Sequence, residues 1–175
     1  MATIGNTSVG GSTRSFNANC KGVLIPSFPA NASANSIFGY VSGTSGQRYQ
    51  ACIISQADYS TILAESDERT DISAAGWYEF TGGTLNGFSL ASGTGYLICV
   101  ATLNASGGLF YYGTYTYDGV TAGSGCSGLS PVTLPDAMGN DATRDYSCYV
   151  DYTEAGGGAW GPLLGLMNNR LVVAQ

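Results

Sequence analysis

The stretch GWYEFTGGTLNGFSLASGTGYLICVA, residues 76–101, sets two strand-like runs on either side of a turn-rich segment. In the first run Tyr78 and Phe80 alternate with Trp77 and Glu79, a pattern typical of a β-strand with two different faces. We expect Trp77, Tyr78 and Phe80 to anchor this strand to a core. The second run, residues 96–101, is apolar on both faces, as in a strand buried within a sandwich. The segment therefore predicts two strands joined by Gly, Ser and Thr turns.

The same alternation recurs along the chain and is clearest in RDYSCYVDYTE, residues 144–154. Its expected buried face carries Tyr146, Cys148, Val150 and Tyr152, and its expected solvent face carries Asp145, Ser147, Tyr149 and Asp151. Further strands are predicted in SIFGYVSG (36–43), RYQACIISQ (48–56) and LFYYGTYTY (109–117). Many short strands with no convincing long helix predict an all-β fold, a jelly-roll-like β-sandwich of two antiparallel sheets over residues 1–154.

The composition changes after Glu154, where a glycine-rich connector leads into a short apolar C-terminal tail, residues 155–175. The tail either folds back onto the sandwich or docks on a partner or on other copies of the chain. The sequence favours docking, because the glycines extend the reach of the tail and exposed apolar side chains aggregate. The predicted partner-binding residues are Trp160, Pro162, Leu163, Leu164, Leu166, Met167, Leu171 and Val172.

The charge pattern excludes several classes of function. The formal net charge is −6 and the six basic residues are scattered, whereas nucleic-acid binding needs clustered positive charge. No run of about 18 apolar residues predicts a membrane span. The N-terminal residues have neither a basic start nor an apolar stretch, so we expect no secretory signal peptide and synthesis into a cytoplasm.

The five cysteines form no C-x-x-C pair, which argues against a zinc site. Cys99 and Cys148 lie in apolar or alternating runs, and we expect them to be buried, reduced thiols. Cys126, within AGSGCSG, is the cysteine most expected to be exposed. The acidic run from Glu65 to Glu68 lacks the spacing of a calcium-binding loop and is predicted to be a solvated loop. No metal or other cofactor is expected.

Catalysis is not expected either. The sequence contains no histidine, so a Ser-His-Asp triad and a Cys-His pair are both ruled out. Paired carboxylates could still serve a glycosidase. The candidates are Glu65, Glu68, Glu79, Asp118, Asp136, Asp145, Asp151 and Glu154. No pattern places one carboxylate in an apolar pocket beside another in a polar one, and no glycine-rich stretch matches a phosphate-binding loop.

The aromatic run at residues 109–117 is the other candidate site. Tyr111, Tyr115 and Tyr117 share one face of the predicted strand, and Phe110 and Tyr112 share the other. An exposed tyrosine row can stack on sugar rings, because the ring face is apolar and the hydroxyl stays hydrated. Ordinary packing is the alternative, and it is favoured because tyrosine suits β-strands in general.

The order of these runs resembles a family of small jelly-roll sandwich domains found in bacteriophage virion proteins and bacterial surface proteins. The resemblance rests on FNANCKGVLIPSFPANASANSIFGYV (16–41), RYQACIIS (48–55), ILAES (62–66), GWYEFTG (76–82), GTGYLICVA (93–101) and DYSCYVDYTE (145–154). It covers residues 1–154 and implies a fold, because the motifs are structural and carry no catalytic residue. The chain departs from it at residues 96–99, where a tryptophan is missing, and at Cys148.

The resemblance and the apolar tail together predict a non-enzymatic virion structural protein, specifically a capsid decoration (cement) protein that stabilises the shell. Its expected location is the virion, and its expected partners are the major capsid protein, other virion subunits and its own copies in a homo-oligomer. The alternative is a glycan-binding module of a tail fibre or a cell-surface protein, acting through Tyr111, Tyr115 and Tyr117. A hydrolase is the third and least favoured interpretation.

Overall fold

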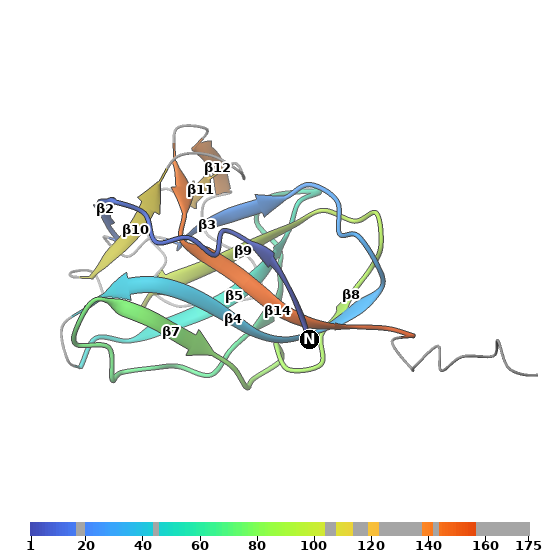
Figure 1. Cartoon of the computed structure of the whole chain (residues 1–175), viewed down its shortest axis with the longest axis horizontal. Coiled ribbons are helices and arrows are strands. Elements are labelled where there is room, and N and C mark those ends of the chain that lie inside the picture. Colours follow the sequence, from blue (N-terminus) through green and yellow to red (C-terminus); the bar gives the residue numbers. More distant parts are fainter. Residues whose placement is uncertain are drawn as a thin grey trace, which may run out of the picture.

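The computed structural model describes residues 1–16, 20–43, 46–103, 108–113, 119–122, 138–141 and 144–156. Within these residues the chain forms β-strands and no helix, and the strands make two antiparallel sheets that pack face to face (Figure 1). The predicted all-β sandwich is therefore confirmed.

Sheet A has eight strands, centred on the long strand β4 (Ala32–Ser42). β4 pairs with β14 (Cys148–Glu154), β7 (Gly76–Phe80), β8 (Ser89–Leu90) and β10 (Leu109–Gly113). The remaining strands are β1 (Ala2–Gly5), which pairs with β14, and β2 (Ser12–Ser15) and β13 (Asp145–Tyr146), which pair with β10. β4 thus brings together segments from the middle of the chain and its last described strand.

Sheet B has six strands in the order β12 (Met138–Asp141), β11 (Gly119–Ala122), β3 (Cys20–Ile25), β9 (Tyr96–Thr102), β5 (Tyr49–Ser55) and β6 (Ile62–Glu65). All seven residues of β9 are buried, because β3 and β5 flank its edges and side chains cover both of its faces. The prediction of a fully buried strand at residues 96–101 is confirmed.

The chain crosses repeatedly between the sheets. β3 lies in sheet B, β4 in sheet A, β5 and β6 in sheet B, β7 and β8 in sheet A, and β9 in sheet B. Successive strands that cross between two packed sheets are typical of jelly rolls. This crossing traps the main core between the sheets, where Phe16, Ile37, Phe80, Ile98 and Val150 are fully or almost fully buried. A second apolar cluster, which includes Leu97, Cys99 and Met138, covers the other face of sheet B.

The strand predicted at residues 144–154 is confirmed in its buried face and wrong in part of its solvent face. Tyr146, Cys148, Val150 and Tyr152 are buried, but so are Asp145 and Ser147. Ser147 lies between β13 and β14, so the strict alternation is interrupted there. The N-terminal segment packs over this break: Gly10 N donates to Ser147 Oγ at 2.9 Å.

The orientation of Trp77 also differs from the expectation. Phe80 is fully buried and Tyr78 packs against the core, as predicted. Trp77 faces away from the core, because it lies opposite Tyr40 on the outward side of β4. An aromatic residue at an outward position of a strand can be covered by neighbours on the same face instead of by the core.

The last described strand lies close to the predicted end of the sandwich domain, and the tail itself stays a prediction. β14 ends at Glu154, and Ala155 N donates to Asn31 O at 2.7 Å. The eight predicted partner-binding residues of the tail lie outside the described residues, as do Cys126, Tyr115 and Tyr117. In the part of the chain that is described, no helix could cross a membrane.

Candidate functional site

Five aromatic side chains gather on the outer face of sheet A, the face turned away from the core. We call this set the aromatic platform, and it consists of Phe38 and Tyr40 from β4, Trp77 from β7, Tyr111 from β10 and Tyr149 from β14. Each of the five is partly exposed. Alternation explains their direction: in β4 the inward residues Ile37, Gly39 and Val41 are buried, so the residues between them point outward.

The strand register places the rings in two adjacent rows. In one row Trp77 lies opposite Tyr40, and β10 continues the sheet on the other side of β4 with Tyr111. In the next row Phe38 lies between Glu79 of β7 and Tyr149 of β14. Neighbouring strands lie about 4.8 Å apart, so three strands present a surface about 10 Å wide.

The rings contact one another across the strands. Phe38 and Tyr149 stack with centroids 4.9 Å apart, while Tyr40 meets Trp77 edge to face at 5.6 Å and Tyr111 edge to face at 4.9 Å. Trp77 and Tyr149 close the cluster at 5.2 Å. Such ring–ring contacts restrict the rotamers of the side chains that make them.

A polar edge borders the platform and consists of Asn35, Glu79, Asp151 and Thr153. A β-bulge creates part of it: Asp151 pairs with Ser36 and Tyr152 with Ala34, which leaves Asn35 as the extra residue. Asn35 Nδ2 donates to Asp151 Oδ2 at 3.3 Å and to Thr153 Oγ1 at 3.2 Å. Glu79 is exposed at the opposite side of Phe38.

The negative charges of the polar edge affect Tyr149, one residue of the platform. Burial raises the pKa of Tyr149, and the negative charges of Asp151 and Glu79 raise it further. The hydroxyl of Tyr149 is thus a neutral donor and acceptor at physiological pH. Apolar ring faces beside carboxylates, an amide and hydroxyls form a surface that suits a sugar, whose C–H faces are apolar and whose rim is polar.

The sequence interpretation found one member of this platform and missed four. Tyr111 is partly exposed and contacts Tyr40, whereas Tyr115 and Tyr117 lie outside the described residues, so the tyrosine row as a whole stays a prediction. Phe38, Tyr40, Trp77 and Tyr149 were not predicted as site residues. The alternation in SIFGYVSG places Phe38 and Tyr40 on one face of the strand and Ile37 and Val41 on the other. This pattern identifies an aromatic outer face, but it does not show which other strands lie beside it.

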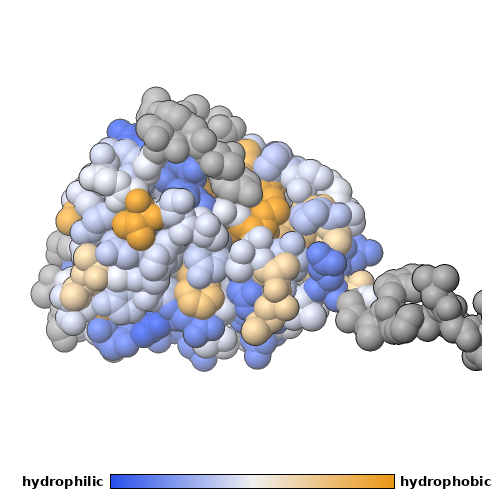
Figure 2. All heavy atoms as spheres, viewed as in Figure 1, coloured by the Kyte–Doolittle hydropathy of each residue, from blue (hydrophilic) through white to orange (hydrophobic). Residues whose placement is uncertain are grey.

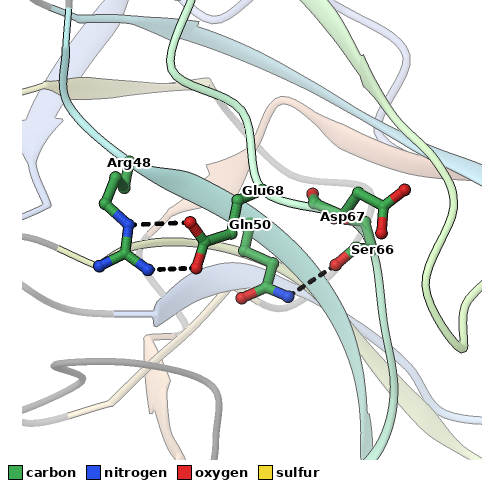
Figure 3. Close-up of polar contacts among 5 residues, drawn as sticks. All are labelled: Arg48, Gln50, Ser66, Asp67 and Glu68. Atoms are coloured by element: carbon green, nitrogen blue, oxygen red, sulfur yellow. Dashed lines mark hydrogen bonds and ion pairs between the residues drawn. The ribbon is translucent and has the colours of Figure 1, made fainter.

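The acidic run 65–68 is partly structural rather than a solvated loop. Ser66 is buried, its Oγ accepts from Ala51 N at 3.0 Å, and its carbonyl accepts from Gln50 Nε2 at 2.6 Å. Figure 3 shows the contact between Gln50 and Ser66 beside the bidentate ion pair between Arg48 and Glu68, in which Arg48 Nε donates to Glu68 at 2.8 Å. The run therefore joins the end of β6 to β5.

Two carboxyl groups of this run have pKa values shifted in opposite directions. Burial raises the pKa of Glu65, while the hydrogen bond from Arg48 lowers that of Glu68. Opposite shifts are a feature of acid/base pairs. Here Glu68 forms an ion pair with Arg48, so the lowered pKa of Glu68 has a structural cause. Of the other carboxylates considered for catalysis, Asp118 and Asp136 lie outside the described residues.

The four described cysteines are all buried: Cys20, Cys52, Cys99 and Cys148. For Cys99 and Cys148 this confirms the prediction. The sulfurs of Cys20 and Cys52 lie 3.7 Å apart, and Cys52 is directly opposite Cys99. Burial and mutual contact raise the pKa of Cys20 and of Cys99. Among the described residues no group of three or more His, Cys, Asp or Glu side chains is arranged to hold a metal ion.

Hydrophobic residues on the side of the molecule seen in Figure 2 are scattered over a mainly neutral to hydrophilic surface. The aromatic rings of the platform carry polar groups in four of five cases, three hydroxyls and one indole N–H. The platform therefore differs from the continuous apolar patch that marks many obligate protein interfaces.

Comparison with known proteins yields a fold relationship. No family model matches the sequence, and no curated protein matches it. The structure is similar to that of a clostridial cysteine protease, Cwp84 after propeptide cleavage, with a TM-score of 0.62 and 12% sequence identity. The similarity covers 88% of this chain and 40% of that chain, so this chain spans less than half of the protease. At this identity the similarity concerns the fold alone.

Proposed function

We propose that the protein is a non-enzymatic carbohydrate-binding module that holds a glycan chain across the outer face of sheet A. The observation that carries the proposal is the aromatic platform with its polar edge: five partly exposed rings beside two carboxylates, an amide and a threonine hydroxyl. An open sheet face suits an extended glycan, whose rings can stack one after another on successive aromatic side chains.

A second argument supports binding without catalysis. The chain has no histidine, so it cannot form the Cys-His pair on which cysteine proteases depend. The four described cysteines are buried, and burial raises the pKa of Cys148 well above the ordinary value, which disfavours a reactive thiolate. The fold shared with part of a protease therefore carries no argument for proteolysis by this chain.

The test is a binding survey on immobilised glycans with the full chain and two variants. Trp77→Ala removes the largest ring of the platform and is expected to weaken binding about tenfold, the loss of one aromatic contact. Tyr59→Asn is the matched control: it removes a partly exposed ring that packs on sheet B, and asparagine tolerates the positive φ of that position.

Binding that weakens in Trp77→Ala and persists in Tyr59→Asn supports the proposal. No binding across a broad set of glycans overturns it, and release of shortened sugars during the survey overturns the non-enzymatic part.

A structural role in a bacteriophage virion stays a prediction. It rests on the sequence of the tail and on the resemblance to virion sandwich domains, and the predicted docking residues 160–172 lie outside the described part. The two roles are compatible, since a module on a virion or on a cell surface can bind glycans. Light scattering of the full chain and of a chain ending after residue 156 tests the tail: self-association of the full chain alone supports docking.

A further inference from the structure

The carboxylates of the polar edge lie close enough to the platform to decide which sugars it accepts. Glu79 is one strand from Phe38 in the same row, and Asp151 lies two residues beyond Tyr149 on the same outward face of β14. Both negative charges act on Tyr149, since both raise the pKa of its hydroxyl. A ligand seated on the rings therefore experiences two carboxylates.

The basic side chains of the described residues have partners outside the aromatic platform. Their partners are Tyr146 Oη for Arg14, Phe16 O for Lys21, Glu68 for Arg48, Asp71 for Arg69 and the ring of Tyr112 for Arg144. Arg69 also donates to the main-chain carbonyl of Glu79, and the charge of Glu79 contributes to the raised pKa of Arg69, but the carboxylate that pairs with Arg69 is Asp71. The whole chain carries a net charge of −6, so the long-range field has the same sign as the polar edge.

Aromatic rings and carboxylates favour the same kind of ligand group. The faces of tryptophan and tyrosine attract cations, with tryptophan the strongest, and carboxylates pair with ammonium groups. An acidic sugar would bring its own carboxylate, sulfate or phosphate against two like charges. A neutral sugar would stack on the rings without any charge contribution.

We propose that the aromatic platform selects glycans that carry protonated amino groups, such as polymers of hexosamine without N-acetyl groups, over neutral glycans, and that it excludes acidic ones. The inference rests on the proposed function, because it names the class of sugar that the same face binds. Trp77 and Tyr149 would contact the sugar ring and its ammonium group, with Asp151 and Glu79 as the counter-charges.

The experiment compares binding of the full chain to glycans of three charge classes on one array, with unacylated amino, neutral and acidic members of matched linkage. It is run at about pH 6, where sugar amines are protonated and ordinary carboxyl groups are ionised. Chitosan and its fully N-acetylated form provide a matched pair. We expect the amino form to bind about five- to tenfold more tightly at low salt, with the difference shrinking as salt is raised.

The double variant Glu79→Gln with Asp151→Asn is expected to abolish the preference while keeping binding to neutral glycans. Its control, Asp58→Asn with Glu68→Gln, removes two exposed carboxylates on either side of β6 in sheet B and changes the net charge equally. Equal loss of the preference in both double variants overturns the inference, because the net charge alone would then explain it.

The remaining outcomes separate the inference from the proposed function. Equal binding to amino and neutral glycans, or tighter binding to acidic ones, overturns the charge selection and leaves carbohydrate binding intact. Amino-glycan binding that survives Trp77→Ala overturns the inference, since the platform would not be involved. No binding to any of the three classes overturns both.

Discussion

The ring of Phe38 stacks on the ring of Tyr149 across the β4–β14 pair, with centroids 4.9 Å apart and an angle of 9° between the planes. The two residues are directly opposite in the register, although 111 positions separate them in the chain. Because this contact lies on the outer face of sheet A, it orders the aromatic platform without being part of the main core.

The Phe38–Tyr149 contact is expected to stabilise the fold as well as the site. In a double-mutant cycle with Phe38→Leu and Tyr149→Leu, we expect a coupling energy of about 0.5–1.5 kcal/mol. Urea unfolding of the two single variants and the double variant measures it. Additive losses within about 0.3 kcal/mol would show that the stacked geometry contributes nothing beyond burial.

Gly22 in β3 is required by close packing against β9. A Cβ there would lie 1.9 Å from Ile98 O and 2.7 Å from Cys99 Cα, both in the neighbouring backbone. We expect Gly22→Ala to lower the free energy of unfolding by about 2 kcal/mol or more, since backbone must move. Gly11→Ala is the control: nothing lies within 4 Å of its Cβ position, and a change within about 0.5 kcal/mol is expected. Equal stability of the two variants would contradict the packing argument.

Tyr49 is expected to make the fold sensitive to alkaline pH. Burial raises the pKa of its hydroxyl to about 12, and the hydroxyl donates to Gln47 Oε1 at 2.6 Å. The neutral form is favoured in the folded state, so this contribution to stability is complete below pH about 10 and is lost as the pH rises toward about 12. The loss is on the order of 2 kcal/mol.

Urea unfolding between pH about 9 and about 11.5 tests this, with Tyr49→Phe as the variant that lacks the titrating group. The variant should lose less stability over that interval than the unmodified protein. An identical pH dependence in both would assign the alkaline sensitivity to other groups.

The buried cysteines are expected to resist thiol reagents in the folded protein. Burial raises the pKa of Cys148, and Cys20, Cys52 and Cys99 are also fully buried. Alkylation followed by peptide mass spectrometry should find these four modified only in denaturant, because the thiolate is the reactive form. Rapid labelling of Cys148 in native buffer would show that the interface between the sheets opens.

Oxidation is expected not to join Cys20 to Cys52, although their sulfurs lie 3.7 Å apart. β9 separates β3 from β5, so the two Cα atoms are about two strand spacings, or about 10 Å, apart. A disulfide needs Cα atoms within about 7 Å. Peptide mapping after mild oxidation tests this, and recovery of a Cys20–Cys52 disulfide would mean that sheet B rearranges.

Local alternation was sufficient to predict strands and their inward faces. The buried set Tyr146, Cys148, Val150 and Tyr152 follows directly from period two, because successive side chains of a strand point to opposite faces. The same rule failed at Asp145 and Ser147, because a break between two strands and a covering N-terminal segment both depend on distant residues.

The candidate site was predictable only in fragments. Tyr111 was identified from its own strand, and Phe38 and Tyr40 could have been assigned to an outer face in the same way. Trp77 was expected in the core, because an aromatic residue in the same short strand as Phe80 gives no local sign of the face that will be covered. Its true neighbours, Tyr40 and Tyr149, come from two other strands.

The sequence by itself determined the all-β class, the positions of the main strands and the residues that fill the core, since these depend on short-range patterns of apolar and polar side chains. Tertiary structure decided which outward residues become neighbours. β4 joins β7, β10 and β14 in one sheet, and the register of each pair sets rings from residues 38 to 149 beside one another and beside Glu79 and Asp151. That register depends on long-range hydrogen bonding and core packing. A shift of one residue in the register of a strand would turn its rings to the other face of the sheet.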